Sequence, residues 1–254
     1  MKMHASQLTV LPETVRMLVD QQFPEWRSLP VKSIVSQGTV NAVFRIGDRL
    51  AARFPLESAD VESTRRWLKS EAEAARELAG RTRFPTPEPV ALGEPGAGYP
   101  LPWSVQTWLP GVVAADEDPG ESSAFARDLA DLIGDLRAIG TQGRTFAGTG
   151  RGGDLRSHDA WMETCFRNSE QLLDVPRLRR IWATLRDLPR GAAEDAMAHC
   201  DLIPGNVLVS DGRLAGILDV GGLGLVWYYV KSNPPMSRTG RRSLERILED
   251  TSLA

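Results

Sequence analysis

The chain has 254 residues, 42% of them hydrophobic and 25% charged, so it is long enough to bury a sizeable core in one large domain or in two lobes. Its net charge of −3 and its isoelectric point near 5.7 argue against a protein that binds the phosphate backbone of nucleic acids. Two widely separated cysteines, no basic and then apolar leader, and no apolar run of about 20 residues predict a cytoplasmic protein without a disulfide framework or a membrane span.

The first part of the chain predicts a helix followed by a meander of strands. Pro12-Glu13 is a helix opening, and apolar residues recur at helical spacing in the segment that follows. Short β-branched and aromatic runs separated by turn residues then predict three strands, at residues 31–35, 42–46 and 49–54. The first part of the chain is therefore expected to be an antiparallel sheet.

Two opposite charges are expected to meet next to this sheet. Arg53 alternates with apolar residues along the third strand, so it points to the opposite face. A helix is expected over residues 60–79, capped by Asp60, and Glu71 lies on its apolar stripe. Because neither charge is buried cheaply alone, an Arg53–Glu71 ion pair is predicted, and two solvent-exposed charges are the alternative.

After a segment interrupted by prolines, the chain becomes mainly helical. Residues 103–111 predict a short strand that ends in a turn, and the glycine-rich residues 145–154 predict a loop. Helices are expected from Ser122 or Ser123 to Gly140, from near His158, and over residues 178–188.

The stretch from His199 to Asp219 carries the polar residues with the most informative spacing. Asp201 and Asn206 stand in an H-x-D-x-x-x-x-N pattern, and two short apolar runs follow, separated by Asp211-Gly212. This dipeptide favours a tight hairpin turn. Because a hairpin returns to its starting end, Asn206 and Asp219 are expected within a few ångströms of each other, with Asp201 beside them.

These side chains suit phosphoryl transfer. One carboxylate and one amide oxygen are good ligands for Mg²⁺, which completes its coordination with phosphate oxygens. The remaining carboxylate can accept a proton from a hydroxyl. The alternative is a solvated loop, but the downstream Asp219 and the hairpin favour a functional site. A P-loop NTPase is excluded, because no G-x-x-x-x-G-K-[ST] motif is present.

His199, Asp201, Asn206 and Asp219 together resemble the motifs of the aminoglycoside phosphotransferase family, which has a protein-kinase-like fold. The resemblance implies an α+β, two-lobed fold. Residues 1–107 would form a small antiparallel sheet with one main helix, and residues 108–254 a larger, mainly helical but shortened lobe with the catalytic loop at 199–206.

The resemblance also implies roles for the residues of the catalytic stretch. Asp201 would be the catalytic base, Asn206 and Asp219 the Mg²⁺ ligands, and His199 a structural brace of the loop. ATP or GTP would be the co-substrate.

Further residues would contact the nucleotide in a member of this family. Arg53 and Glu71 would stand where kinases have a Lys–Glu pair, so Arg53 departs from the usual residue. Gly38 would lie in the loop over the phosphates, although a single glycine makes a poor phosphate cradle. The backbone near Gln106 and Trp108 would form the hinge that hydrogen-bonds the adenine.

By resemblance, the protein would transfer the γ-phosphate to a hydroxyl of a small, aminoglycoside-like molecule. The family pattern departs after Asp219, as if an internal segment were missing, so the acceptor pocket is expected to be incomplete. A catalytically impaired nucleotide-binding or interaction module is therefore an alternative, and so is a kinase of another hydroxylated metabolite. The sequence leaves the acceptor, the choice between ATP and GTP, and the oligomeric state open.

Overall fold

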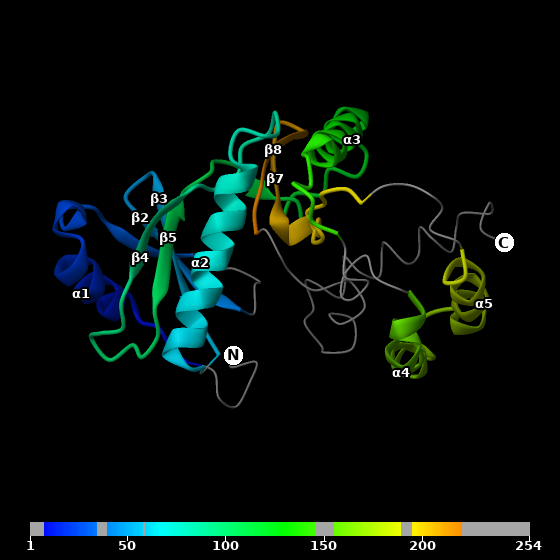
Figure 1. The fold of residues 1–254 in the computed structure, drawn as a ribbon, viewed down its shortest axis with the longest axis horizontal. Coiled ribbons are helices and arrows are strands. Elements are labelled where there is room, and N and C mark those ends of the chain that lie inside the picture. The colour runs from blue at the N-terminus through cyan, green and yellow to red at the C-terminus, as the bar shows by residue number, and fades with distance from the viewer. Residues whose placement is uncertain (1–7, 35–39, 58, 146–154, 189–194, 220–254) are drawn as a thin grey trace.

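The computed structural model describes residues 8–34, 40–57, 59–145, 155–188 and 195–219. Its first part is built around a five-stranded antiparallel sheet with the strand order β1-β2-β3-β5-β4 (Figure 1). The strands are β1 (Val31–Ile34), β2 (Asn41–Ile46), β3 (Leu50–Pro55), β4 (Pro89–Gly93) and β5 (Trp103–Thr107). The three strands predicted at residues 31–35, 42–46 and 49–54 are confirmed to within about a residue at each end, and the later short strand is confirmed as β5.

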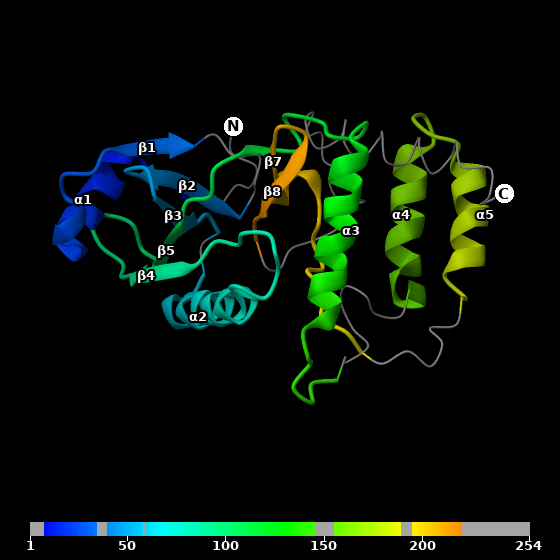
Figure 2. The same ribbon diagram turned by 90° about the horizontal axis from the view of Figure 1, so that it is seen from above.

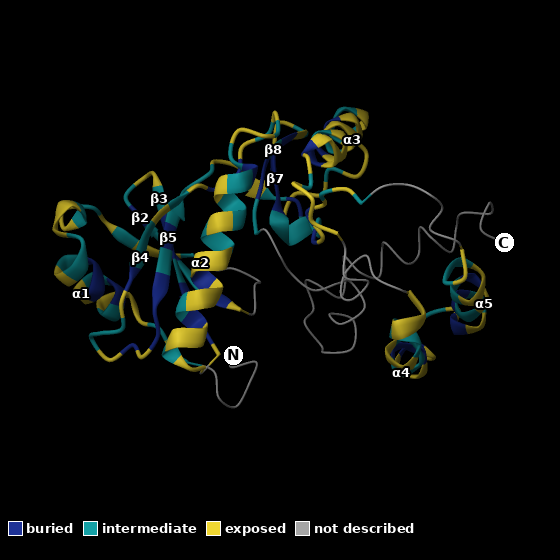
Figure 3. Ribbon diagram, in the orientation of Figure 1, coloured by how far each residue is buried: buried dark blue, intermediate teal, exposed yellow. Residues whose placement is uncertain are grey.

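The two faces of this sheet have different roles because side chains alternate along each strand. One face carries Phe44, Phe54 and Trp103, all at most 2% exposed, and packs against helix α1 (Pro12–Gln22). The opposite face carries Arg53, whose register partners are Val43 on β2 and Ser104 on β5. This second face is therefore the one available for a polar site. Figure 3 shows that buried residues lie along the central strands β3 and β5.

Helix α2 (Val61–Leu78) lies beside the β4 and β5 edge of the sheet (Figure 2). Asp60 caps its first turn by accepting a hydrogen bond of 2.8 Å from the backbone N–H of Ser63, as the sequence predicts. Gly80 follows the helix with a φ of +68°, a conformation that glycine adopts without strain. Leu78, at the end of α2, packs into the core of the second part of the chain.

In the residues that the structure describes, the second part combines a small sheet with three α-helices. The sheet has the order β6-β7-β8, from β6 (Val112–Val113), β7 (Val207–Ser210) and β8 (Arg213–Ile217). It packs against α3 (Ser123–Ala138), whereas α4 (Asp159–Ser169) and α5 (Val175–Leu185) pack against each other through a separate apolar cluster. This is the expected α+β arrangement of a sheet with one main helix followed by a mainly helical part. The lobe boundary at residues 107 and 108 stays a prediction.

The prolines before β5 were expected only to interrupt the pattern, yet Pro89 begins strand β4. Pro89 pairs with Gln106 at the edge of the sheet, where a missing N–H breaks no interior ladder, and the register shifts between Pro89 and Ala91. Among the described helices, none is long and apolar enough to cross a membrane. The tail and the gap inferred after Asp219 lie outside the described residues.

The β7–β8 hairpin is fixed to α3 by Asp128. The carboxylate of Asp128 accepts hydrogen bonds from Arg213 Nε at 2.6 Å, from Arg213 Nη2 at 2.5 Å and from the backbone N–H of Leu214 at 3.2 Å. The Arg213 guanidinium lowers the pKa of Asp128 below its ordinary value of 3.8. The side chain of Asp128 is only 6% exposed, so water competes poorly for these hydrogen bonds.

We expect Asp128→Asn to lower the free energy of unfolding by about 1–2 kcal/mol at pH 7, because it weakens a set of charge-assisted hydrogen bonds. Since the folded pKa of Asp128 is lowered, this contribution is present above the unfolded value and is lost as the pH falls through the folded value. Urea unfolding at pH 7 and near pH 3 measures both effects.

Asp131→Asn is the matched control on the same helix. Asp131 is 52% exposed and pairs with an exposed Arg83, so its replacement is expected to change stability by about 0.5 kcal/mol or less. Equal losses in the two variants would show that Asp128 does not anchor the hairpin.

Candidate active site

The β7–β8 hairpin brings its two ends together as its turn residues predict. Asp211 and Gly212 have φ values of +52° and +68°, which are the positive angles of a tight two-residue turn. At the open end, the backbone N–H of Leu218 donates to the carbonyl of Asn206 over 2.7 Å. The residue before the hairpin and the residue after it, Asn206 and Asp219, therefore lie at the same end.

The loop that precedes the hairpin is tied to this end by side chains. Asn206 Nδ2 donates to Asp201 Oδ2 at 2.7 Å and to the Asp201 carbonyl at 3.1 Å. His199 Nε2 is 3.0 Å from the carbonyl of Leu218, on the other strand end. His199 and Asp201 are 4% and 6% exposed, so these contacts are sheltered from water. The structure thus places Asp201, Asn206 and Asp219 at the open end of the β7–β8 hairpin.

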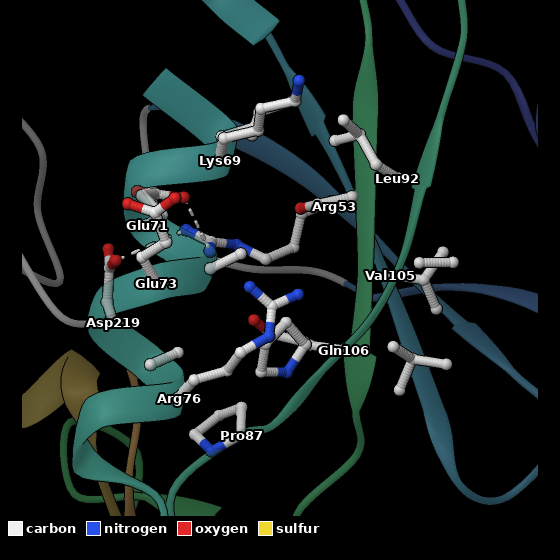
Figure 4. Close-up of a pocket in the computed structure, with 17 residues that line it drawn as sticks. Arg53, Lys69, Glu71, Glu73, Arg76, Pro87, Leu92, Val105, Gln106 and Asp219 are labelled. Carbon is white, nitrogen blue, oxygen red and sulfur yellow. Dashed lines mark hydrogen bonds and ion pairs between the residues drawn. The ribbon is translucent and has the colours of Figure 1, made fainter. Parts of the chain in front are cut away.

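Arg53 connects this hairpin end to the sheet and to α2 (Figure 4). Its Nη1 donates to Glu71 Oε2 at 3.2 Å, and its Nη2 donates to Asp219 Oδ1 at 3.4 Å. The side chains of Arg53, Glu71 and Asp219 are 13%, 20% and 31% exposed. The ion pair expected from the sequence is therefore present, and a second carboxylate shares the same guanidinium.

The environment of Glu71 opposes its ionisation. Burial raises the pKa of Glu71 above its ordinary value of 4.5, the nearby Arg53 lowers it in part, and the charge of Asp219 raises it again. One guanidinium shared between two carboxylates does not fully neutralise the negative charge of both. Any cation that binds Asp219 would relieve this repulsion.

Gln106, Trp108 and Gly38 are the further residues expected to contact the nucleotide, and the structure describes the first two of them. Gln106 lies on the same face of the sheet as Arg53, opposite Ala51 on β3. The backbone N–H of Trp108, however, already donates to the carbonyl of Arg49 over 2.7 Å. The Arg45 guanidinium lies 4.9 Å from the centre of the Trp108 ring. Gly38 lies outside the described residues.

A cavity of about 450 Å³ adjoins these groups and brings four of the predicted residues together: Arg53, Glu71, Gln106 and Asp219. Asp201, Asn206 and Trp108 do not line it. Two residues that the sequence did not single out, Lys69 and Arg76 of α2, also line this cavity. Their seven-residue spacing places them on one helix face, but the pattern alone did not distinguish them from ordinary surface cations.

The backbone near the hinge shows a second feature that the sequence did not identify. Among the described residues, the N–H of Leu109 makes no backbone hydrogen bond, whereas those of Thr107 and Trp108 donate to Glu88 and Arg49. Leu109 is thus the first residue after β5 whose N–H is available. No side-chain signal could have identified it, because every residue except proline carries this group.

Residues 33–229 match the model of the APH phosphotransferase enzyme family. The chain belongs to this family. No curated protein matches the sequence.

Solved structures of phosphotransferases have the same fold. The chain is 19% identical to an APH(2″) enzyme in complex with GDP and kanamycin, with 94% of this chain and 86% of that chain covered and a TM-score of 0.59. It is 18% identical to a thermostable mutant of APH(4)-Ia in complex with AMP-PNP and hygromycin B, with coverages of 93% and 83% and a TM-score of 0.55.

A further similar structure is the macrolide 2′-phosphotransferase MphH from Brachybacterium faecium. Its identity is 20%, the alignment covers 82% of this chain and 72% of that one, and the TM-score is 0.53. At these identities the similarity shows the fold, so the two-lobed protein-kinase-like fold expected from the sequence is confirmed.

Because its folded pKa is raised, Glu71 contributes most to stability when it is protonated, and that contribution is lost as the pH rises from its ordinary value of 4.5 through the folded value. We therefore expect the stability of the wild-type protein relative to Glu71→Gln to fall as the pH is raised from about 4.5 upward. Urea unfolding of both proteins across this range measures the difference.

Glu62→Gln removes a carboxylate that is 70% exposed at the start of the same helix, away from this cavity, and serves as the control for changes in the charge of α2. A stability difference between wild type and Glu71→Gln that rises with pH would contradict the expected electrostatic environment of Glu71.

Proposed function

We propose that this protein transfers the γ-phosphate of ATP or GTP to a hydroxyl group of a small molecule. Membership of the phosphotransferase family supports the reaction class. The observation that carries the proposal is that Asp201, Asn206 and Asp219 lie at the open end of one hairpin. Arg53 donates a hydrogen bond to Asp219 at the same place.

In this proposal Asp201 is the catalytic base. The Asn206 amide donates to one of its carboxylate oxygens, which fixes the orientation of the side chain. An ionised carboxylate held in this way can orient an acceptor hydroxyl and take its proton as the phosphoryl group arrives. Burial of Asp201 at 6% exposure keeps bulk water from competing for that position.

Asn206 and Asp219 fit a magnesium site by their chemistry. Because Asn206 Nδ2 is turned toward Asp201, its amide oxygen points away from that carboxylate, and Asp219 adds a carboxylate at the same hairpin end. Oxygen donors of this kind suit a small hard cation. When bound, Mg²⁺ would neutralise phosphate charge and hold the phosphate oxygens. Asp219 has a φ of +53°, so its position is enforced by the surrounding structure.

The remaining predicted residues would bind the nucleotide. Arg53 would bridge Glu71 and the phosphates, since a guanidinium has enough donors for both. Gln106 and Trp108 would flank the nucleobase at the hinge, with the Leu109 N–H as an available donor. Gly38 would belong to the loop over the phosphates.

For the acceptor we propose a hydroxylated, aminoglycoside-like molecule. Two of the similar structures contain kanamycin or hygromycin B, and a third is named as a macrolide phosphotransferase. The alternative acceptor is a different hydroxylated metabolite, and a screen of both kinds of acceptor distinguishes the two.

A catalytically impaired nucleotide-binding module is the second candidate. It is favoured by the contact of Arg53 with Asp219, because that ion pair engages a carboxylate that a metal would need. Binding of Mg·ATP or Mg·GTP without phosphorylation of any acceptor would support this candidate.

Asp201→Asn is expected to lower the rate of nucleotide-dependent phosphorylation by about 10³-fold, because it removes the proton acceptor while keeping the shape of the side chain. The dissociation constant for the nucleotide should change less than about threefold. Both are measured with a coupled assay over a panel of aminoglycosides and by calorimetric titration.

Asp211→Asn, in the exposed hairpin turn, is the matched control, since asparagine also tolerates a positive φ. It should retain nearly full activity. Equal activity of wild type and Asp201→Asn would remove Asp201 from the mechanism.

Asp219→Asn is expected to raise the Mg²⁺ concentration needed for half-maximal nucleotide binding by about tenfold or more, because a neutral amide binds a divalent cation less strongly than a carboxylate does. Titration of Mg²⁺ at a fixed nucleotide concentration measures this shift. An unchanged Mg²⁺ dependence in Asp219→Asn would show that this residue is not a metal ligand.

A further inference from the structure

The connection between α2 and β4, residues 79–88, contacts the second part of the chain although both of its ends belong to the first part (Figure 2). Phe84 of this connection packs against the core cluster that includes Leu136 of α3 and Ile217 of β8. The carbonyl of Pro85 accepts a hydrogen bond of 3.1 Å from the backbone N–H of Ile217. The connection is therefore attached to both α3 and the β7–β8 hairpin.

Arg83 binds two carboxylates of α3. Its backbone N–H and its Nε each donate to Asp135 Oδ2 at 3.0 Å, and its Nη2 donates to Asp135 Oδ1 at 3.0 Å. Its Nη1 donates to Asp131 Oδ2 at 3.0 Å. The fork of a guanidinium fits a carboxylate in a defined orientation, so this set of hydrogen bonds fixes the backbone of the connection at residue 83.

The connection approaches β8 so closely that it leaves little room for a side chain at residue 216. A Cβ added to Gly216 would lie 3.1 Å from the carbonyl oxygen of Pro85 and 3.1 Å from Leu109 Cδ1. A backbone oxygen cannot swing away as a flexible side chain can. The connection and the end of β8 therefore do not move independently.

Asp219 follows this contact by two residues. It has a φ of +53°, a conformation that a residue other than glycine keeps only when its surroundings hold it. The hydrogen bond from Ile217 to Pro85 is one of the interactions that hold this end of the hairpin. Because Arg83 fixes the connection that carries Pro85, its bonds to α3 also bear on the position of Asp219.

We propose that Arg83 is a positioning residue for Asp219. By binding two carboxylates of α3 it fixes the connection, and the Pro85 carbonyl then holds the end of β8 that precedes Asp219. The consequence for Mg²⁺ rests on the proposed function, in which Asp219 is a metal ligand. A displaced carboxylate would bind the cation more weakly.

The alternative is an ordinary surface ion pair. Arg83 is 58% exposed, and exposed ion pairs contribute little to the global stability of a protein. The two explanations differ in which part of the molecule changes when Arg83 is replaced. Loss of a surface pair leaves the hairpin end as it is, whereas loss of a positioning residue makes the Ile217 N–H separate more often from its acceptor.

Hydrogen exchange of the full chain without nucleotide, followed by mass spectrometry, tests this difference. In Arg83→Ala, the amides of Ile217 and Leu218 are expected to exchange about tenfold or more faster than in the wild type, because the hairpin end opens more easily. A peptide from α1 should exchange at the wild-type rate, which shows that the rest of the fold is intact. Unchanged exchange at residues 217 and 218 would overturn the proposal.

Two further variants make this test specific. Arg81→Ala removes the same charge from an exposed position two residues earlier in the connection, so it should exchange like the wild type. Arg83→Lys keeps the charge but lacks the fork of donors, so its exchange should lie between those of the wild type and Arg83→Ala. If Arg83→Ala does not fold, wild-type exchange rates in Arg83→Lys would overturn the proposal.

Titration of Mg²⁺ at a fixed concentration of ATP or GTP separates a positioning role from a purely structural one. Arg83→Ala should raise the Mg²⁺ concentration needed for half-maximal nucleotide binding about threefold or more. In an Asp219→Asn background the same substitution should add no further shift, because Arg83 acts through Asp219. An unchanged Mg²⁺ dependence, or an equal shift in both backgrounds, would overturn the proposal.

The two measurements also distinguish this inference from the proposed function. Absence of any Mg·nucleotide binding by the wild type would count against the proposed function, while hydrogen exchange would still decide whether Arg83 holds the hairpin end. Nucleotide binding that depends on Asp219, together with unchanged exchange in Arg83→Ala, would overturn the role of Arg83 and leave the proposed function standing.

Discussion

The position of the Arg53 guanidinium between two carboxylates is the interaction on which the candidate site depends. Arg53 belongs to β3, Glu71 to α2 and Asp219 to the end of the β7–β8 hairpin, so one side chain joins three elements of the fold. The groups are mostly buried, and partial desolvation makes each charge costly without its partners. The raised pKa of Glu71 reflects the same constraint, since one cation serves two anions.

Helix α2 connects the Arg53 ion pair on the sheet to the helical part of the chain. Near its C-terminal end, Glu77 accepts a hydrogen bond of 3.0 Å from Arg144 Nη1, and Leu78 packs with residues of α3, β7 and β8. The middle of the helix, by contrast, leaves a cavity beside β4 and β5. The helix is thus held firmly at its end, while the segment that carries Glu71 borders an open space. This arrangement makes the position of Glu71 sensitive to whatever fills that space.

Much of the local structure could be predicted because it depends on neighbouring residues. Asp60 caps α2 and Asp211-Gly212 turns the hairpin through interactions within a few positions of the chain, and alternation placed Arg53 on the polar face of β3. Strand β4 was missed because Pro85, Pro87 and Pro89 favour a break in structure, and only an edge position next to β5 allows Pro89 to pair. The bond between the Trp108 N–H and Arg49 was equally invisible, since backbone groups carry no sequence signal.

The sequence by itself determined which residues carry the chemistry: an H-x-D-x-x-x-x-N motif, a hairpin that returns to its start, and a downstream aspartate in a family whose members are phosphotransferases. Only the tertiary structure decided that Asp219 shares Arg53 with Glu71, although 166 positions separate Arg53 from Asp219. It also decided that Lys69 and Arg76 of α2 face the same cavity as Ser104 and Gln106 of β5. The physical reason is that spacing along a strand or helix fixes directions within one element, whereas contacts between elements depend on how their apolar faces pack.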